Sequence, residues 1–142
     1  MTPIYILLVE DNEGDIMLTK EALEDAKILI NLAVKKDGKE AIDYLSVRES
    51  NDLPDLILLD VNLPKKSGHE VLKFIKENDL IKHIPVIMLT TSSSEKDINL
   101  SYNNYANCYI TKPVDASDFL SVVATIENFW VSIVKLPVKK NN

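Results

Sequence analysis

The chain has little cysteine and no long apolar run. Cys108 is the single cysteine among 142 residues, so no disulfide can form within the chain, and a reducing compartment fits. The apolar stretch at residues 4–9 is too short to cross a bilayer, and it lacks the basic start and the cleavage site of a signal peptide. We therefore expect a cytoplasmic protein with no membrane segment.

Basic residues are also in deficit. The chain has 16 Lys and Arg against 22 Asp and Glu, which gives a formal net charge of -6. Binding to nucleic acid or to an anionic membrane surface requires clustered positive charge, and the clusters of adjacent lysines in this sequence are no larger than pairs. We therefore expect no DNA binding and no membrane binding.

What the sequence does contain is a regular alternation of strand-like and helical segments. Apolar runs that suit strands lie at residues 3–9, 30–35, 56–59, 86–89 and 108–111. Helical periodicity follows each of them, at residues 14–27, 39–47, 68–78, 94–103 and 115–134. Five such units predict a flavodoxin-like, doubly wound α/β fold, (βα)5, with a parallel five-stranded sheet in the order 2-1-3-4-5. We expect one domain over residues 1–134 and a C-terminal tail over 135–142.

Polar residues stand where these strands end. Glu10 and Asp11 follow the first run, Asp60 follows the third, Thr90 follows the fourth and Lys112 follows the fifth. The carboxyl ends of parallel strands share one edge of a sheet, so these side chains can meet there. Three adjacent carboxylates repel one another, and a hard divalent cation such as Mg²⁺ relieves the repulsion. An aspartate beside such a cation can accept a phosphoryl group, with Lys112 and Thr90 offsetting the charge on its oxygens.

Each of these residues alone has an ordinary explanation. Asp11 can belong to a helix cap, and Asp60 can be a turn acid before Pro64. Capping does not explain the whole set, in which acids, a hydroxyl and an ammonium group follow four of the five strands. We therefore interpret the set as one functional site.

Four short motifs surround these residues: Val9-Glu-Asp-Asn12, Leu59-Asp-Val-Asn-Leu-Pro64, Leu89-Thr-Thr-Ser92 and Tyr109-Ile-Thr-Lys-Pro113. Together they resemble the motifs of response-regulator receiver domains, the phosphoacceptor half of two-component signalling, and the resemblance covers roughly residues 3–130. It implies that Asp60 is phosphorylated and that Mg²⁺ is held by Glu10, Asp11, Asp60 and the backbone carbonyl of Asn62. It also implies that Lys112 pairs with the phosphate and that the Lys112–Pro113 bond is cis.

The resemblance further implies a conformational switch. Thr90 matches the switch hydroxyl of the family, and Tyr109 matches the switch aromatic, whose ring turns inward when the hydroxyl moves toward phosphate. On chemistry alone, an aromatic residue that is simply packed at a strand end explains Tyr109 equally well. Asn62 and Ser92 occupy positions that resemble those tuning phosphate lifetime in the family.

One position departs from the family. Receivers usually carry Gly where this chain has Tyr105, and a left-handed turn there costs a bulky residue roughly 1 kcal/mol or more. We expect Asn103 or Asn104 to take that conformation instead, because Asn tolerates it.

Within the family, the chain looks closest to single-domain receivers that work with bacterial phytochrome-type histidine kinases. The features that carry this similarity are residues 10–15 and the ending at residues 129–137. The phosphodonor histidine should then belong to the kinase, and we expect His69 and His83 at the surface. No DNA-binding segment follows residue 134, so we expect output by protein contact.

The last predicted helix carries more apolar residues than one core face needs. The stripe that suits the core consists of Phe119, Val122, Val123, Ile126, Trp130 and Ile133. A helix that reaches Val134 would extend past the sheet and expose Trp130, Ile133 and Val134, and exposed apolar area of this kind often marks an interface. We expect a homodimer through this segment, with a tail folded back on its own domain as the alternative.

Other functions fit the residues less well. A phosphatase with an aspartate nucleophile usually has a second acid two residues later, where this chain has Asn62. A flavin or nucleotide carrier needs a Gly-rich or Ser/Thr-rich phosphate loop after the first strand, and residues 10–13 would repel phosphate without a metal. An interaction module that works without phosphate would have no use for the acids at the strand ends. We interpret the chain as a phosphoacceptor signalling protein that catalyses only its own phosphorylation and dephosphorylation.

Overall fold

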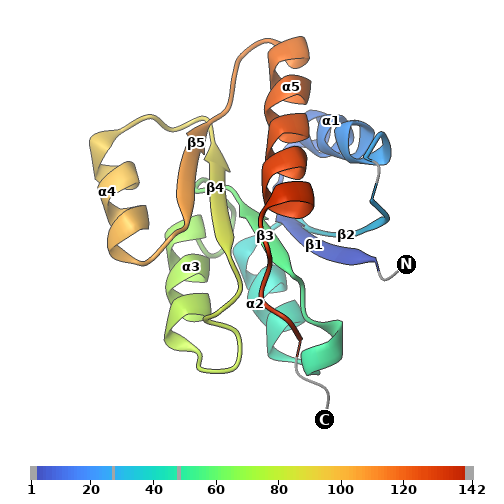
Figure 1. Cartoon of the computed structure of the whole chain (residues 1–142). Coiled ribbons are helices and arrows are strands. Elements are labelled where there is room, and N and C mark those ends of the chain that lie inside the picture. Colours follow the sequence, from blue (N-terminus) through green and yellow to red (C-terminus); the bar gives the residue numbers. More distant parts are fainter. Residues whose placement is uncertain (1–2, 27, 48, 140–142) are drawn as a thin grey trace.

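Five parallel strands form one sheet in the computed structural model, which describes residues 3–26, 28–47 and 49–139. The strands are β1 (Ile4–Val9), β2 (Ile30–Lys35), β3 (Leu56–Leu59), β4 (Val86–Thr90) and β5 (Cys108–Thr111). Their order is β2-β1-β3-β4-β5, and every neighbouring pair is parallel (Figure 1). The predicted strands and the predicted winding order are confirmed.

A helix follows each strand, as the periodicity predicts. These helices are α1 (Glu13–Glu24), α2 (Gly38–Ser46), α3 (Gly68–Glu77), α4 (Glu95–Asn103) and α5 (Ala116–Ile126), with a short 3-10 helix, η1 (Ser50–Asp52), before β3. Each of the five α-helices begins at a capping side chain that accepts a hydrogen bond from the first turn: Asn12, Asp37, Ser67, Ser94 and Asp115. Within the described ranges, no helix has the length and apolar character needed to cross a bilayer.

The sheet is buried on both faces, which explains the continuous apolar run of β3. Ile57 and Leu59 pack with α2 and α3 on one face, and Leu56 and Leu58 pack with α1 and α5 on the other. All four residues of β3 are buried, as expected for a central strand that helices cover on both sides. The α4 helix contacts α3 and β5 at the far edge of the sheet (Figure 1).

The α5 helix continues into a π-helical segment, η2 (Glu127–Ile133), which changes the buried face. The wider π turn moves the next buried residue five positions beyond Ile126, to Val131. The prediction that Ile133 belongs to the core stripe is therefore wrong, because its side chain is 60% exposed. Trp130 and Val134 are half-buried, so they are less exposed than the extended-helix prediction implied.

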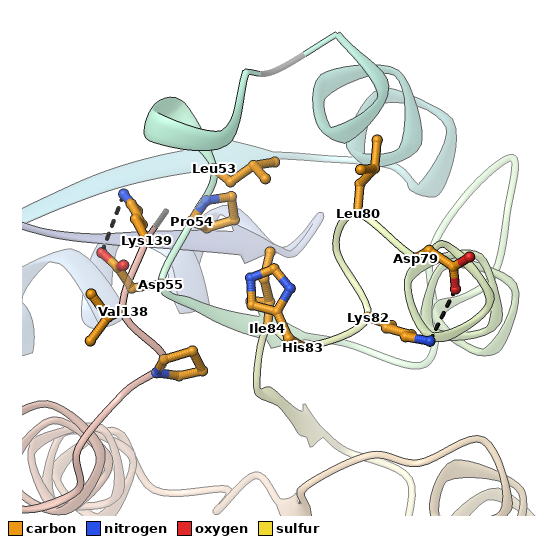
Figure 2. Close-up of a pocket in the computed structure, with 11 residues that line it drawn as sticks. Leu53, Pro54, Asp55, Asp79, Leu80, Lys82, His83, Ile84, Val138 and Lys139 are labelled. Carbon is orange, nitrogen blue, oxygen red and sulfur yellow. Dashed lines mark hydrogen bonds and ion pairs between the residues drawn. The ribbon is translucent and has the colours of Figure 1, made fainter. Parts of the chain in front are cut away.

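The described part of the tail folds back across the amino ends of the strands. Lys139 Nζ lies 3.6 Å from the Asp55 carboxylate and 4.3 Å from the centre of the Tyr5 ring. Pro137, Val138 and Lys139 line a cavity of about 550 Å³ together with the segments that precede β3 and β4 (Figure 2). The folded-back alternative thus holds for residues 135–139. Two predictions fall outside the described residues. They are the end of the first helix, at residue 27, and the end of the tail, at residues 140–142.

Tyr105 itself adopts the left-handed conformation, with φ of 68°, so the expectation of Asn103 or Asn104 is wrong. The end of α4 accounts for this. The Tyr105 N–H donates to the Tyr102 carbonyl, and the next N–H, that of Ala106, donates to the Ser101 carbonyl. This pairing is a Schellman motif. The C-cap of α4 is Asn104, and the motif requires the next residue, Tyr105, to be left-handed. The last turn of α4 therefore places the strained position on Tyr105.

Candidate functional site

The acids that follow β1 and β3 meet at the carboxyl edge of the sheet. Pairing of Val9 with Leu59 brings the ends of these strands level, and the Asp60 N–H donates to the Val9 carbonyl at 3.1 Å. One carboxylate oxygen from each of Glu10, Asp11 and Asp60 lies within 4.8 Å of the others. The structure therefore brings together the three carboxylates that the strand ends predicted.

A glycine allows α3 to begin close to this edge. A Cβ atom on Gly68 would lie 2.0 Å from the backbone carbonyl oxygen of Asp60, a distance that no side chain permits. The Gly68 N–H also donates to the Val61 carbonyl at 2.8 Å. The segment that carries Asp60 and Asn62 is thereby held between β3 and α3, and the Asn62 N–H donates to Asp60 Oδ1 at 3.2 Å.

Lys112 is buried and contacts three carboxylates. Its N–H donates to the Thr90 carbonyl at 2.7 Å, which fixes the backbone of Lys112 beside the end of β4. Its Nζ lies 2.9 Å from Asp60 Oδ2 and 2.9 Å from Asp15 Oδ2, and it also contacts Glu10 Oε1. Lys112 therefore points into the acidic cluster from the strand next to β4, as predicted.

The sequence did not predict the contact with Asp15. Asp15 lies in the first turn of α1, where an acid is favourable for any helix because of the helix dipole, so the residue carried no distinguishing signal. Its partner Lys112 is 97 positions away in the chain. A fourth carboxylate therefore belongs to the cluster and shares the same cation.

Burial sets the ionisation of the cluster. It raises the pKa of Glu10 to about 7, and the charge of Asp60 adds to this effect, while the hydrogen bond from Lys112 opposes it. Burial alone would lower the pKa of Lys112, but its hydrogen bonds to Glu10, Asp15 and Asp60 outweigh burial and raise it. Negative charge is thus in excess, and the oxygens of Glu10, Asp11 and Asp60 suit a hard divalent cation.

Thr90 and Tyr109 lie beside this cluster on β4 and β5. Thr90 is fully buried, and its Oγ1 accepts a hydrogen bond from the Ser92 N–H at 3.4 Å. The half-buried Tyr109 side chain packs against the core cluster on the α2 and α3 side of the sheet, and its hydroxyl donates to the Ser92 carbonyl at 2.8 Å. We call this arrangement the inward orientation of Tyr109.

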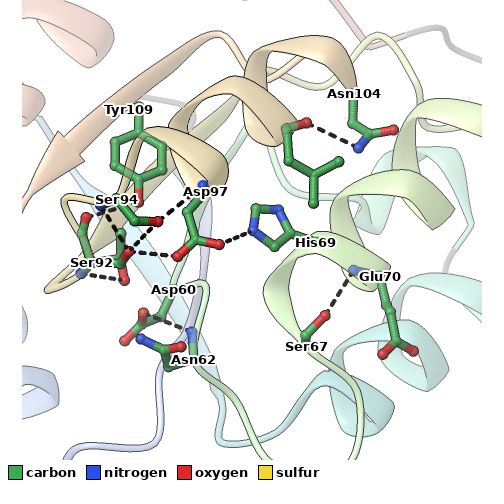
Figure 3. A network of polar contacts seen from close by, with 12 residues as sticks. Asp60, Asn62, Ser67, His69, Glu70, Ser92, Ser94, Asp97, Asn104 and Tyr109 are labelled. Atoms are coloured by element: carbon green, nitrogen blue, oxygen red, sulfur yellow. Dashed lines mark hydrogen bonds and ion pairs between the residues drawn. The ribbon is translucent and has the colours of Figure 1, made fainter.

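Two further predictions are wrong. No peptide bond in the described residues is cis, so the Lys112–Pro113 bond is trans, the form that X-Pro bonds prefer by about 0.5–1 kcal/mol. His69, expected at the surface, is half-buried, because the close start of α3 places it against α4. Its Nε2 lies 2.9 Å from Asp97 Oδ1 (Figure 3). His83 is exposed, as predicted.

Replacing Lys112 by Met should destabilise the metal-free protein by about 3–5 kcal/mol at neutral pH, because buried carboxylates lose their cation. The loss should be smaller near pH 4.5 and grow as pH rises through about 7, because Glu10, whose pKa burial raises to about 7, is protonated at the lower pH and needs no cation there. Urea unfolding with a chelator at both pH values measures this. Lys39→Met, which breaks the exposed pair with Asp43, should change the free energy of unfolding by less than about 0.5 kcal/mol. An equal loss from Lys112→Met at both pH values would contradict the charge argument.

Known proteins share this sequence and this fold. Residues 6–124 match the family described as the response regulator receiver domain. Response regulator Rcp1 of Synechocystis sp. is 45% identical over 138 residues, covering 95% of this chain and 94% of Rcp1. FilR2 of Methanothrix harundinacea, described as a probable methanogenesis regulatory protein, is 40% identical over 137 residues, covering 95% of this chain and 88% of FilR2.

Solved structures agree with these sequence matches. The crystal structure of the phosphorylated cyanobacterial phytochrome response regulator RcpA matches with a TM-score of 0.92 and 46% identity, covering 96% of this chain and 100% of RcpA. The Mn²⁺-bound form of Rcp1 matches with a TM-score of 0.91 and 45% identity, covering 96% of this chain and 100% of that structure. With the acidic cluster and Lys112 in place at the carboxyl edge of the sheet, the chain belongs to the response regulator receiver family of two-component phosphorelay signalling.

Proposed function

We propose that this receiver accepts a phosphoryl group on Asp60 from the phosphohistidine of a histidine kinase. The observation that carries the proposal is the surroundings of the Asp60 carboxylate. Lys112 Nζ lies 2.9 Å from one of its oxygens, and oxygens of Glu10 and Asp11 lie within 4.8 Å. A nucleophilic carboxylate, a cation and a place for a metal therefore converge at one point.

The transfer uses residues that are already in place. A carboxylate oxygen of Asp60 attacks the phosphorus, the bond from phosphorus to the imidazole nitrogen breaks, and that nitrogen keeps the electron pair. Glu10, Asp11, Asp60 and the Asn62 carbonyl would hold Mg²⁺, which would offset charge on the transferred oxygens. Lys112 would exchange part of its contact with Asp15 and Glu10 for a phosphoryl oxygen, and the Thr90 hydroxyl would donate to another.

The same site is suited to reactions on Asp60 itself. We propose that the chain catalyses only its own phosphorylation and dephosphorylation, with Asn62 and Ser92 as the residues beside the acyl phosphate that set its lifetime. Asn62 contacts Asp60 Oδ1 through its N–H, and Ser92 contacts Thr90 Oγ1, so both lie next to reacting groups. Neither supplies a second carboxylic acid of the kind that an aspartate-based phosphatase uses.

Incubation with acetyl phosphate and Mg²⁺ should add one phosphoryl group, about 80 Da, to the intact protein. The gain should disappear in Asp60→Asn, because an amide does not attack phosphorus, and persist in Asp43→Asn, which changes an exposed acid of α2. Intact-protein mass spectrometry measures both. Continuous release of many phosphates per chain each second would instead support a phosphatase.

Asp11→Asn should weaken Mg²⁺ binding about tenfold or more, since a nearby unit charge is worth at least 1.4 kcal/mol in a partly buried site. Asp11 is exposed, so stability without metal should change by less than about 0.5 kcal/mol. Thermal unfolding at rising Mg²⁺ concentration reports the binding, because a ligand at 100 times its Kd adds about 2.7 kcal/mol. Glu21→Gln on α1 is the matched control, and an unchanged Mg²⁺ requirement in Asp11→Asn would exclude Asp11 as a ligand.

The similarity to RcpA supports a phytochrome-type histidine kinase as the phosphodonor. RcpA is described as a cyanobacterial phytochrome response regulator, and it is 46% identical to this chain. FilR2 is 40% identical and is described as a probable methanogenesis regulatory protein. This degree of similarity therefore occurs among response regulators of different processes. We propose the phytochrome-type kinase as the first donor to test.

We also propose a homodimer through α5 and η2. Phe129 is 49% exposed and Ile133 is 60% exposed, and the Phe129 and Trp130 rings meet edge to face with centroids 5.8 Å apart. Beside them, Ile110, Val122 and Trp130 help to line an apolar groove of about 410 Å³. Contiguous exposed apolar area of this kind is typical of an interface.

Sedimentation velocity should detect a dimer at tens of micromolar protein, and Phe129→Ser with Ile133→Ser should shift it to monomer. The expected cause is loss of apolar area from the interface, since neither residue is buried in the monomer. Met17→Ser, which changes a residue 70% exposed on α1, should leave the dimer intact. A monomer at these concentrations, both with and without phosphorylation, would remove the dimer proposal.

A further inference from the structure

The α4 helix has little apolar anchoring. Ser101 is the buried residue of this helix, and Leu100 is exposed. In contrast, α3 buries Val71, Leu72 and Ile75. Hydrophobic burial scales with the area removed from water, so it contributes much less to the position of α4 than to that of α3. Polar contacts must therefore carry more of the attachment of α4.

Several of these polar contacts converge on Asp97, in the first turn of α4. Its Oδ1 lies 2.9 Å from His69 Nε2, and its Oδ2 accepts a hydrogen bond from Ser92 Oγ at 2.5 Å (Figure 3). Its own N–H donates to Ser94 Oγ at 3.1 Å. The hydrogen bonds from Ser92 and then from His69 lower the pKa of Asp97, which keeps the carboxylate ionised and an acceptor for both.

His69 supplies the other end of this arrangement from α3. To bond a carboxylate, Nε2 must carry the hydrogen and donate it. His69 lies in the first turn of α3, just after the segment that carries Asp60 and Asn62. The pair therefore joins the segment after β3 to the segment after β4. We call His69, Asp97 and Ser92 the polar latch.

Ser92 connects the polar latch to the switch residues. Its carbonyl accepts the Tyr109 hydroxyl at 2.8 Å, and its N–H donates to Thr90 Oγ1 at 3.4 Å. One residue thus contacts Tyr109, Thr90 and Asp97 through three different groups. Any displacement of Ser92 changes the place available to the Tyr109 hydroxyl and the surroundings of the Thr90 hydroxyl.

We propose that His69 is a positioning residue of the switch: through Asp97 and Ser92 it holds the loop of residues 91–94 where Tyr109 adopts the inward orientation. The inference rests on the proposed function of Asp60 for its effect on phosphorylation, but not for its effect on Tyr109. Without the donor at position 69, Asp97 and Ser92 keep one hydrogen bond to each other and lose their tie to α3. The inward population should then fall about fivefold relative to the alternative, the magnitude expected for one net hydrogen bond.

The first test follows Tyr109 directly. The chain has five tyrosines, so fluorotyrosine labelling gives few ¹⁹F resonances, and Tyr109→Phe assigns the one of interest. In His69→Leu, which keeps bulk but has no donor, the Tyr109 resonance should move and broaden. In His69→Gln, whose amide can donate to Asp97, it should stay at the wild-type position. Asp43→Ala, which breaks the exposed Lys39 pair on α2, is the control and should leave it unchanged.

A second test uses the reaction. With acetyl phosphate and Mg²⁺, His69→Leu should acquire the phosphoryl group on Asp60 about fivefold more slowly, because the loop that positions the Thr90 hydroxyl is less ordered. His69→Gln should restore the rate. In a Tyr109→Phe background, which already lacks the bond to the same Ser92 carbonyl, the effect of His69→Leu should be smaller, because the two changes act on one residue.

The outcomes separate the two proposals. An unchanged Tyr109 resonance in His69→Leu overturns the positioning role, as does a rate loss of equal size in the wild-type and Tyr109→Phe backgrounds. If His69→Leu does not fold, Asp97→Ala removes the polar latch from the α4 side, and the same shifts are required of it. A wild-type protein that takes up no phosphoryl group would refute the role of Asp60, while the ¹⁹F result would still decide that of His69.

Discussion

The contact of one buried ammonium group with several carboxylates is the interaction on which the rest of this structure depends. Lys112 reaches Asp60, Glu10 and Asp15 from the end of β5; the parallel pairing of β1, β3, β4 and β5 brings Glu10, Asp60 and Lys112 to one edge, and α1 adds Asp15. Burying charged groups costs several kcal/mol for each ion, and replacement by apolar residues is often neutral or stabilising. Stability therefore does not account for the cluster. Its excess negative charge is instead suited to a divalent cation and to chemistry on a carboxylate. Desolvation of these groups therefore costs stability, but it also creates a site that favours binding of a cation.

Rigidity is unevenly distributed around this cluster, and the distribution suits a signalling domain. The β3 strand, which Asp60 follows, is buried on both faces, whereas α4 buries Ser101 alone among its described residues. Asp60 thus follows a strand that is buried at every residue, and the neighbouring surface is held mainly by hydrogen bonds. Packed cores change little, while segments with few apolar contacts can shift at small free-energy differences. The loop of residues 91–94 joins buried β4 to α4, and through Ser92 it contacts Thr90 on one side and Asp97 on the other.

The sequence predicted the elements and the gathered residues wherever one local signal was decisive. Apolar runs, or alternation in the case of residues 30–35, specified the strands, and polar residues at strand ends specified the edge where they meet. The errors have particular physical causes. Asp15 joined the cluster through a partner 97 positions away, which no local pattern encodes. Val131 replaced Ile133 in the core because a π turn shifts the periodicity by one residue. Tyr105 took the left-handed position because the end of α4 determines where a Schellman motif falls. The roles of Asp60, Thr90 and Tyr109 in phosphoryl transfer and switching stay predictions.

Under the proposed function, magnitudes indicate how much one phosphoryl group can contribute to a conformational switch. A phosphoryl group adds negative charge next to Lys112, and two unit charges 4 Å apart interact by about 4 kcal/mol at an effective dielectric constant of 20. A complete reversal of a two-state equilibrium from 1:99 to 99:1 needs about 5.5 kcal/mol. One hydrogen bond, such as that of Tyr109 with the Ser92 carbonyl, contributes about 1 kcal/mol. Under the proposed function, the charge added at Asp60 supplies most of the free energy that such a transition needs, whereas one hydrogen bond of the polar latch of His69, Asp97 and Ser92 is of the size that adjusts the resting balance. A change at His69 should therefore tune the signal without abolishing it, because it alters the smaller of the two terms.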